Sequence, residues 1–120
     1  MVKKVMIVED SNLMASVISN FIKRSGKELQ IITAHSGEES VEIYKSEKPD
    51  LVFMDIKMPG MDGITALEKI KQIDANAKVV MCTSLKDTES EERSKKAGCV
   101  GYIMKPFNSN DILDALDKNV

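Results

Sequence analysis

Short apolar runs recur along the chain and are separated by segments in which apolar residues repeat at helical spacing. Because each run is bounded by polar residues and is too short for a helix, we predict that the runs are strands. The run Leu51–Met54 lacks polar alternation, which is typical of a strand covered on both faces. The five predicted strands are Lys4–Val8, Leu29–Thr33, Leu51–Met54, Val79–Cys82 and Val100–Met104.

The segments between the runs predict helices with one apolar face each. A capping box of Ser36 and Glu39 opens the second helix, and Ser109 is the predicted cap of the last. Residues of the second and third helices are predicted to point inward. The apolar residues that carry the helical patterns are Leu13, Met14, Val17, Ile18, Phe21 and Ile22, then Val41 and Tyr44, then Ile64, Leu67, Ile70 and Ile73, and finally Ile112, Leu113 and Leu116.

The fourth predicted helix, Asp87–Ala97, has almost no apolar face. Its local signals are a capping box of Thr88 with Glu91 and the pairs Glu91–Lys95 and Glu92–Lys96. A helix that is polar all round lacks the packing that normally holds helices down, so we expect it to be loosely docked.

Five strands that alternate with five helices predict an α/β fold, a doubly wound parallel sheet with helices on both faces. The length of 120 residues fits one domain, residues 1–120. With 42% apolar and 30% charged residues and no run of about 20 apolar residues, the sequence is typical of a soluble protein. The apolar start is too short for a signal peptide, so we expect a cytoplasmic location and no membrane association.

Charge and cysteine content narrow the function classes. The net charge is −2 and there is no basic run, which gives nucleic-acid binding no electrostatic support. Cys82 and Cys99 do not have metal-ligand spacing, and Cys82 lies in an apolar run typical of a buried, reduced thiol.

Polar residues follow four of the strands where each strand ends. They are Glu9-Asp10, Asp55, Thr83-Ser84 and Lys105. The carboxyl ends of parallel strands share one edge of the sheet, which is where ligands bind in such folds. Crowded carboxylates repel one another, and Mg²⁺, which prefers oxygen ligands, would remove that conflict. With the positive charge of Lys105 and the hydroxyl of Thr83, this set favours phosphoryl transfer onto a carboxylate.

Four motifs together resemble the signature of CheY-like receiver domains of response regulators, in the same order and over essentially the whole chain. They are the acidic pair Glu9-Asp10, the stretch Asp55–Gly63, the pair Thr83-Ser84 and the triplet Lys105-Pro106-Phe107. The resemblance implies a flavodoxin-like strand order of 2-1-3-4-5. It implies a switch that receives a phosphoryl group from a histidine kinase and then changes its binding to a target protein.

The resemblance also implies a role for each matching residue. Asp55 is the phosphoacceptor. Mg²⁺ is held by Asp10 directly, by Glu9 through water, by Asp55 and by the backbone carbonyl of Lys57. Lys105 contacts the phosphoryl group, and its bond to Pro106 is expected to be cis.

Two further residues are implied to carry the response. Thr83 is the switch hydroxyl that moves toward the phosphoryl group, and Tyr102 is the aromatic side chain whose rotamer changes with it. Target proteins bind the face made by the fourth helix, the fifth strand and the fifth helix. We expect a monomer that takes part in its own phosphorylation and dephosphorylation only, and is otherwise not an enzyme.

The sequence departs from the family pattern at three places, one of which is the polar fourth helix described above. Glu9 stands where aspartate is more usual, and the longer side chain favours a water-mediated role. Lys57 and Leu85 lie two residues beyond Asp55 and Thr83, where family side chains flank the attacking water. Leu85 cannot orient water, so we predict slow self-hydrolysis of the phosphoryl group.

Several functions remain open on the sequence. A chemotaxis regulator is the leading subtype, with a phosphorelay shuttle or the excised receiver of a longer regulator as alternatives. A Mg²⁺-dependent aspartyl phosphatase would need an Asp-x-Asp motif where this chain has Glu9-Asp10-Ser11. A flavin- or nucleotide-binding module would need a phosphate-binding loop rich in glycine or hydroxyl residues after the first strand.

Overall fold

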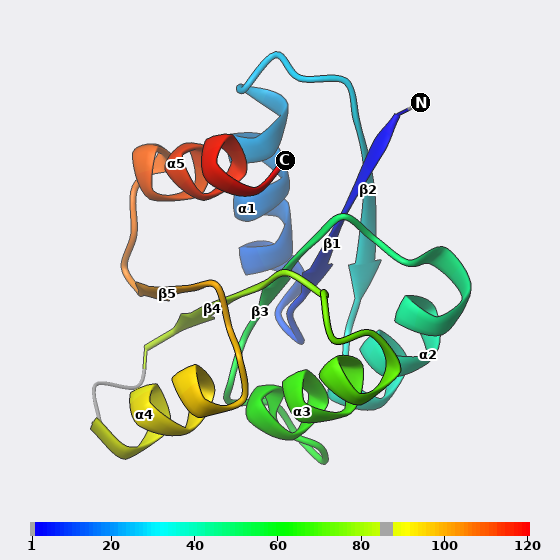
Figure 1. Ribbon diagram of the computed structural model, residues 1–120. Coiled ribbons are helices and arrows are strands. Elements are labelled where there is room, and N and C mark those ends of the chain that lie inside the picture. Colours follow the sequence, from blue (N-terminus) through cyan, green and yellow to red (C-terminus); the bar gives the residue numbers. More distant parts are fainter. Residues whose placement is uncertain (1, 85–87) are drawn as a thin grey trace.

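Strands and helices alternate through the whole chain (Figure 1). The computed structural model describes residues 2–84 and 88–120, and within them no helix has the length and apolar character needed to cross a bilayer. The elements are β1 (Lys3–Val8), α1 (Asn12–Lys23), β2 (Leu29–Ala34), α2 (Gly37–Glu47), β3 (Leu51–Met54), α3 (Gly63–Ile73), β4 (Val79–Thr83), α4 (Thr88–Lys96), β5 (Gly101–Met104) and α5 (Ser109–Asn119).

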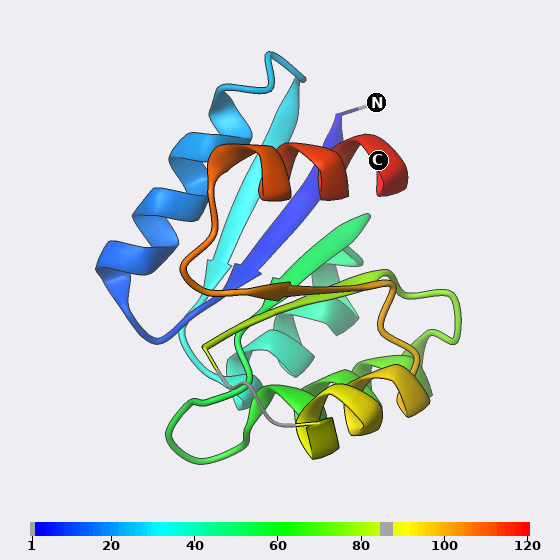
Figure 2. The same cartoon turned by 90° about the vertical axis from the view of Figure 1, so that its left-hand side faces the viewer.

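The strands form one parallel sheet in the order β2-β1-β3-β4-β5. Helices α1 and α5 cover one face, and α2, α3 and α4 cover the other (Figures 1 and 2). The predicted fold class and strand order are therefore confirmed.

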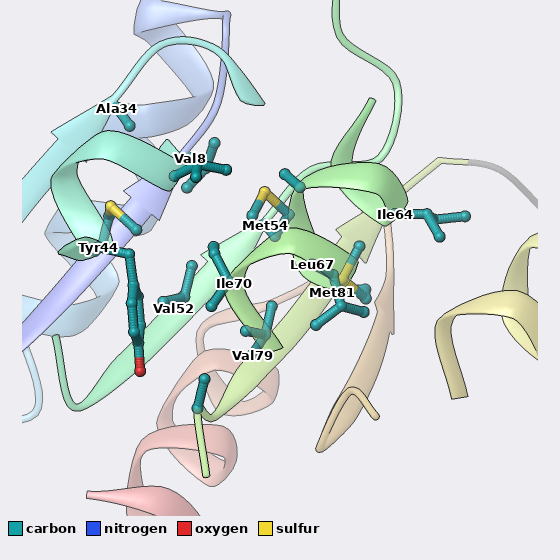
Figure 3. Close-up of a cluster of buried hydrophobic side chains, with 14 of the residues drawn as sticks. Val8, Ala34, Tyr44, Val52, Met54, Ile64, Leu67, Ile70, Val79 and Met81 are labelled. Atoms are coloured by element: carbon teal, nitrogen blue, oxygen red, sulfur yellow. The ribbon is translucent and has the colours of Figure 1, made fainter. Parts of the chain in front are cut away.

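Each central strand supplies both layers of the core because successive side chains point to opposite faces. In β1, Val5 and Ile7 pack with α1 and α5, whereas Met6 and Val8 pack with α2 and α3. This two-sided burial explains why β1 and β3 are apolar at every central position. Figure 3 shows the layer beneath α2 and α3, where helix residues Tyr44, Ile64, Leu67 and Ile70 meet strand residues Val52, Met54, Val79 and Met81.

Two apolar residues of the predicted helical patterns lie at the surface, and one of them, Ile73, was predicted to point inward. The side chain of Leu13 is 77% exposed and that of Ile73 is 39% exposed. Leu13 lies in the first turn of α1 and Ile73 is the last residue of α3. Helical periodicity alone does not show that the packed part of a helix is shorter than the helix.

The caps of two helices also differ from the prediction. The side chain of Asn108, not Ser109, caps α5, and it forms a reciprocal capping box with Asp111. At α2, the hydroxyl of Ser36 accepts the N–H of Glu39 at 3.0 Å, as predicted. The carboxylate of Glu39, however, accepts the N–H of His35 at 3.0 Å, so the box is not reciprocal.

Helix α4 buries little of its surface. Ser94 is its buried residue, and the described part of the chain offers the Ser94 hydroxyl no hydrogen-bond partner. Glu91 and Lys95 form the predicted ion pair at 2.9 Å, whereas residues 88–96 show none between Glu92 and Lys96. The predicted start of this helix at Asp87 lies outside the described residues.

Candidate functional site

The carboxyl ends of β1 and β3 place acidic residues side by side at one edge of the sheet. The N–H of Glu9 donates to the carbonyl of Ala34 at 3.0 Å, and the N–H of Asp55 donates to the carbonyl of Val8 at 3.0 Å. These bonds extend the hydrogen-bond ladder by one residue beyond the carboxyl ends of β1 and β3. The backbone that carries both carboxylates is therefore fixed by neighbouring strands.

Glu9, Asp10 and Asp55 form a carboxylate cluster in which one oxygen of each residue lies within 4.8 Å of the others. Glu9 and Asp55 are 2% and 7% exposed, whereas Asp10 lies at the surface. An all-oxygen donor set with one side open to water suits a hard, partly hydrated cation such as Mg²⁺. These residues could hold the predicted ion, and their individual roles as ligands stay predictions.

Lys105 supplies the positive charge in this cluster. Its N–H donates to the carbonyl of Thr83 at 2.8 Å, and its peptide bond to Pro106 is cis, as predicted. Its ammonium lies 2.8 Å from an oxygen of Glu9 and 3.5 Å from an oxygen of Asp55. Lys105 thus contacts two of the three carboxylates, the closer one on Glu9.

The electrostatics of the cluster reflect three acids and one lysine in a partly buried site. Burial raises the pKa of the Glu9 carboxyl, and the charge of Asp55 adds to this shift although Lys105 opposes it. Burial opposes the charge of Lys105, yet its hydrogen bond to Glu9 and the nearby acids raise the pKa of its ammonium overall. The site therefore holds an excess of negative charge that a further cation would relieve.

The two predicted switch residues lie on neighbouring strands. Thr83 is the last residue of β4 and is fully buried. Tyr102 lies on β5 opposite Met81 and packs against the core layer beneath α2 and α3, with its ring half-buried. Their roles in switching stay predictions.

Asp55 begins the site loop, residues 55–62, which joins β3 to α3. Ile56 and Met58 are buried at 3% and 7% exposure, and the Lys57 side chain between them is exposed. A hollow beside the cluster is lined by Asp10, Lys57, Met58 and Pro59. Lys57 therefore lies along the rim of the acidic cluster, while the metal-binding role of its carbonyl stays a prediction. Leu85, on which the predicted slow hydrolysis also depends, lies outside the described residues.

Gly63 supports the site in a way the sequence analysis missed. Its N–H donates to the carbonyl of Ile56 at 2.8 Å. A Cβ atom at this position would overlap the backbone carbonyl of Asp55. The sequence offered only a glycine in a turn, and nothing in its spacing indicated this close approach to the acidic residue.

Comparisons with known proteins agree with this architecture. The sequence model of the response regulator receiver domain matches residues 5–117. The chain is 43% identical over 117 residues to the chemotaxis protein CheY of Halobacterium salinarum, covering 97% of this chain and 95% of that one. It is 40% identical over 120 residues to the chemotaxis protein CheY of Bacillus subtilis, covering 100% and 99%.

Solved structures include a chain that is similar in both fold and sequence. It comes from the CheX-CheY-BeF3-Mg²⁺ complex of Borrelia burgdorferi, with a TM-score of 0.89, 32% identity, and coverage of 97% of this chain and 87% of that one. The family match spans nearly the whole chain and includes every predicted site residue. The chain therefore belongs to the response regulator receiver domain family.

Proposed function

We propose that this protein is a signalling switch that accepts a phosphoryl group on Asp55 from a histidine kinase, with Mg²⁺ as cofactor. The observation that carries the proposal is the position of the Asp55 carboxylate. It lies within 4.8 Å of oxygens of Glu9 and Asp10 and 3.5 Å from the ammonium of Lys105. A nucleophilic carboxylate between cation ligands and a lysine suits in-line phosphoryl transfer, which depends on positioning and charge neutralisation.

In the proposed reaction, an oxygen of Asp55 attacks the phosphorus of a phosphohistidine. The bond from phosphorus to the imidazole nitrogen breaks, an acyl phosphate forms, and the leaving imidazole takes up a proton. Bound Mg²⁺ would supply positive charge to the phosphoryl oxygens. Lys105 turns from Glu9 toward the phosphoryl group, because the new dianion is a stronger partner for its ammonium.

The proposed output is a change in protein binding. Phosphorylation shifts an equilibrium between two conformations through Thr83 and Tyr102, and a target protein then binds the face made by α4, β5 and α5. A role in chemotaxis is supported by the CheY relatives. The structure that contains CheX, CheY, BeF3 and Mg²⁺ supports both a protein partner and the cofactor. We expect no turnover of a separate substrate.

The proposal is tested by intact mass after incubation with Mg²⁺ and acetyl phosphate. The wild type should gain one phosphoryl group, and Asp55→Asn should gain none. Asp114→Asn, an exposed aspartate on α5, serves as the matched control and should behave as the wild type. A wild type that gains no mass, and binds no beryllofluoride, would show that the chain is a binding module independent of phosphorylation.

A further inference from the structure

The exposed tip of the site loop contacts the first turn of α2. One carboxylate oxygen of Glu38 accepts the N–H of Met61 at 3.4 Å. At Gly37, a Cβ atom would lie 2.6 Å from the carbonyl oxygen of Met61. The two backbones therefore approach more closely than a side chain at residue 37 would allow. At Gly60, whose φ is +76°, a Cβ atom would lie 2.9 Å from the other carboxylate oxygen of Glu38.

The first turn of α2 is itself firmly held. The Ser36 hydroxyl caps it, and the buried hydroxyl of Ser40 donates to the carbonyl of Gly37 at 2.7 Å. One and two turns further on, Val41 and Tyr44 anchor the helix in the core. Glu38 therefore reaches the site loop from a rigid element.

The rest of the site loop is held by other means. Its start is tied to β1 through the N–H of Asp55, and its end is tied to Ile56 through the N–H of Gly63. Between these ends, Met58 is buried in the core, whereas Pro59 and Gly60 are exposed. The exposed tip is the part on which the contact with Glu38 acts.

We propose that Glu38 is a positioning residue for the phosphorylation site. By holding the tip of the site loop, it limits the movement of the segment that carries Asp55 and the carbonyl of Lys57. The inference rests on the proposed Mg²⁺-dependent phosphorylation and adds a residue that touches neither the ion nor the phosphoryl group. Because a metal site binds best when its ligands are held in place, a loose loop would weaken Mg²⁺ binding.

A simpler role for Glu38 is a favourable charge near the positive end of the α2 dipole. Two substitutions separate the two roles. Glu38→Gln keeps an oxygen acceptor for the N–H of Met61 but removes the charge, and Glu38→Ala removes both. Positioning predicts that glutamine rescues Mg²⁺ binding, whereas a charge effect predicts that glutamine fails as alanine does.

The test is a Mg²⁺ titration of the full chain followed by amide NMR shifts, together with hydrogen exchange at Met61. Glu38→Ala should weaken Mg²⁺ binding about two- to tenfold, the effect of one lost hydrogen bond, and should speed exchange of the Met61 amide. Glu38→Gln should remain close to the wild type. Glu42→Ala, an exposed acid of the same helix that pairs with Lys45, is the matched control and should change neither quantity.

Three results in the variants would overturn the inference. They are unchanged Mg²⁺ affinity in Glu38→Ala, an equal loss in Glu42→Ala, or a glutamine variant as weak as the alanine variant. A wild type that binds no Mg²⁺ would overturn the proposed function and this inference with it. Wild-type binding that Glu38→Ala leaves intact would overturn the inference alone.

Discussion

Lys105 and Glu9 form the closest ion pair of the site, with 2.8 Å between the ammonium and a carboxylate oxygen, compared with 3.5 Å between Lys105 and Asp55. The lysine therefore rests nearest to an acid that we expect to face the metal through water. Both Lys105 and Mg²⁺ compensate the charge of Glu9, so the two cations should compete electrostatically. This competition links the resting ion pair to cation binding.

Replacing Lys105 by methionine tests the competition. Lys105→Met removes a positive charge beside the cluster while keeping an unbranched side chain. We expect Mg²⁺ affinity to rise about tenfold, as the loss of about 1.4 kcal/mol of repulsion would give. The rate of phosphorylation by acetyl phosphate should fall about a hundredfold, since one stabilising contact to the phosphoryl oxygens is lost. Titration calorimetry measures the Mg²⁺ affinity, and intact mass measures the rate of phosphorylation. A variant in which both the affinity and the rate fall would contradict the competition.

Mg²⁺ should stabilise the folded protein in a pH-dependent way. At about ten times its dissociation constant, a ligand of the native state adds about 1.4 kcal/mol to the free energy of unfolding. The folded pKa of Glu9 is raised, so its contribution to stability is present below its unfolded pKa and is lost as the pH rises through the folded value. A carboxylate must be deprotonated to bind a cation, so Mg²⁺ should stabilise the protein at neutral pH and lose this effect as Glu9 becomes protonated.

Urea unfolding with and without Mg²⁺, at neutral and acid pH, checks this expectation. Asp10→Asn should abolish the stabilisation at neutral pH. Asp62→Asn, which keeps an oxygen to cap α3 and lies outside the cluster, is the control. Equal stabilisation of the wild type and Asp10→Asn would count against a metal site at this cluster.

Gly63→Ala should damage the fold at the phosphorylation site. The added Cβ atom would overlap the carbonyl of Asp55, which is backbone and cannot rotate away. We expect a loss of about 1–3 kcal/mol or more in the free energy of unfolding. At Gly101 a Cβ atom would meet Val80 at 3.4 Å, an ordinary contact, so Gly101→Ala should change stability by no more than about 0.5 kcal/mol. Similar urea midpoints for the two variants would refute the overlap.

The contact between Tyr44 and Asp74 should make stability depend on alkaline pH. The Tyr44 hydroxyl donates to the Asp74 carboxylate at 2.9 Å, and burial together with this bond raises the pKa of Tyr44. Because the folded pKa exceeds the unfolded one, the contribution is complete below about pH 10 and is lost as the pH rises. Tyr44→Phe should lower stability by about 1 kcal/mol at neutral pH and flatten the alkaline decline. An unchanged alkaline slope in thermal unfolding would rule this out.

Ser94→Ala should tighten the docking of α4. The change removes a buried hydroxyl that lacks a hydrogen-bond partner in the described part of the chain, and alanine is the better helix former. We expect a gain of about 1 kcal/mol and slower amide exchange over residues 89–96. Strong protection of these amides in the unphosphorylated wild type would contradict the loose docking predicted from the polar sequence of α4.

The fold could be predicted from the sequence because its strongest signals are local. Leu51–Met54 is apolar throughout, and β3 has those bounds in the structure. Parallel topology then brings strand ends together, so Asp55 and Lys105 could be grouped although they lie far apart in the chain. Both inferences depend on periodicity and strand direction rather than on the detail of side-chain contacts.

The finer contacts could not be predicted because they depend on side-chain reach across the fold. Lys105 lies closer to Glu9 than to Asp55, and neither the spacing of these residues nor the strand order indicates which acid is nearer. The hydrogen bond from Met61 to Glu38 spans 23 residues and joins the site loop to the first turn of α2, two segments with no shared sequence pattern. The cap of α5 fell on Asn108 rather than Ser109 because both residue types cap well and backbone direction decides between them.

The backbone bonds that tie Glu9, Asp55 and Lys105 to Ala34, Val8 and Thr83 have a consequence for how such a protein can diversify. The backbone at these three residues is fixed by neighbouring strands, and the outward faces of α4 and α5 take no part in these bonds. Under the proposed function, substitutions on the outward faces of α4 and α5 should change which target protein binds while leaving the backbone at Glu9, Asp55 and Lys105 in place. Surface substitutions alone would then be enough to give the same acidic site a new binding partner.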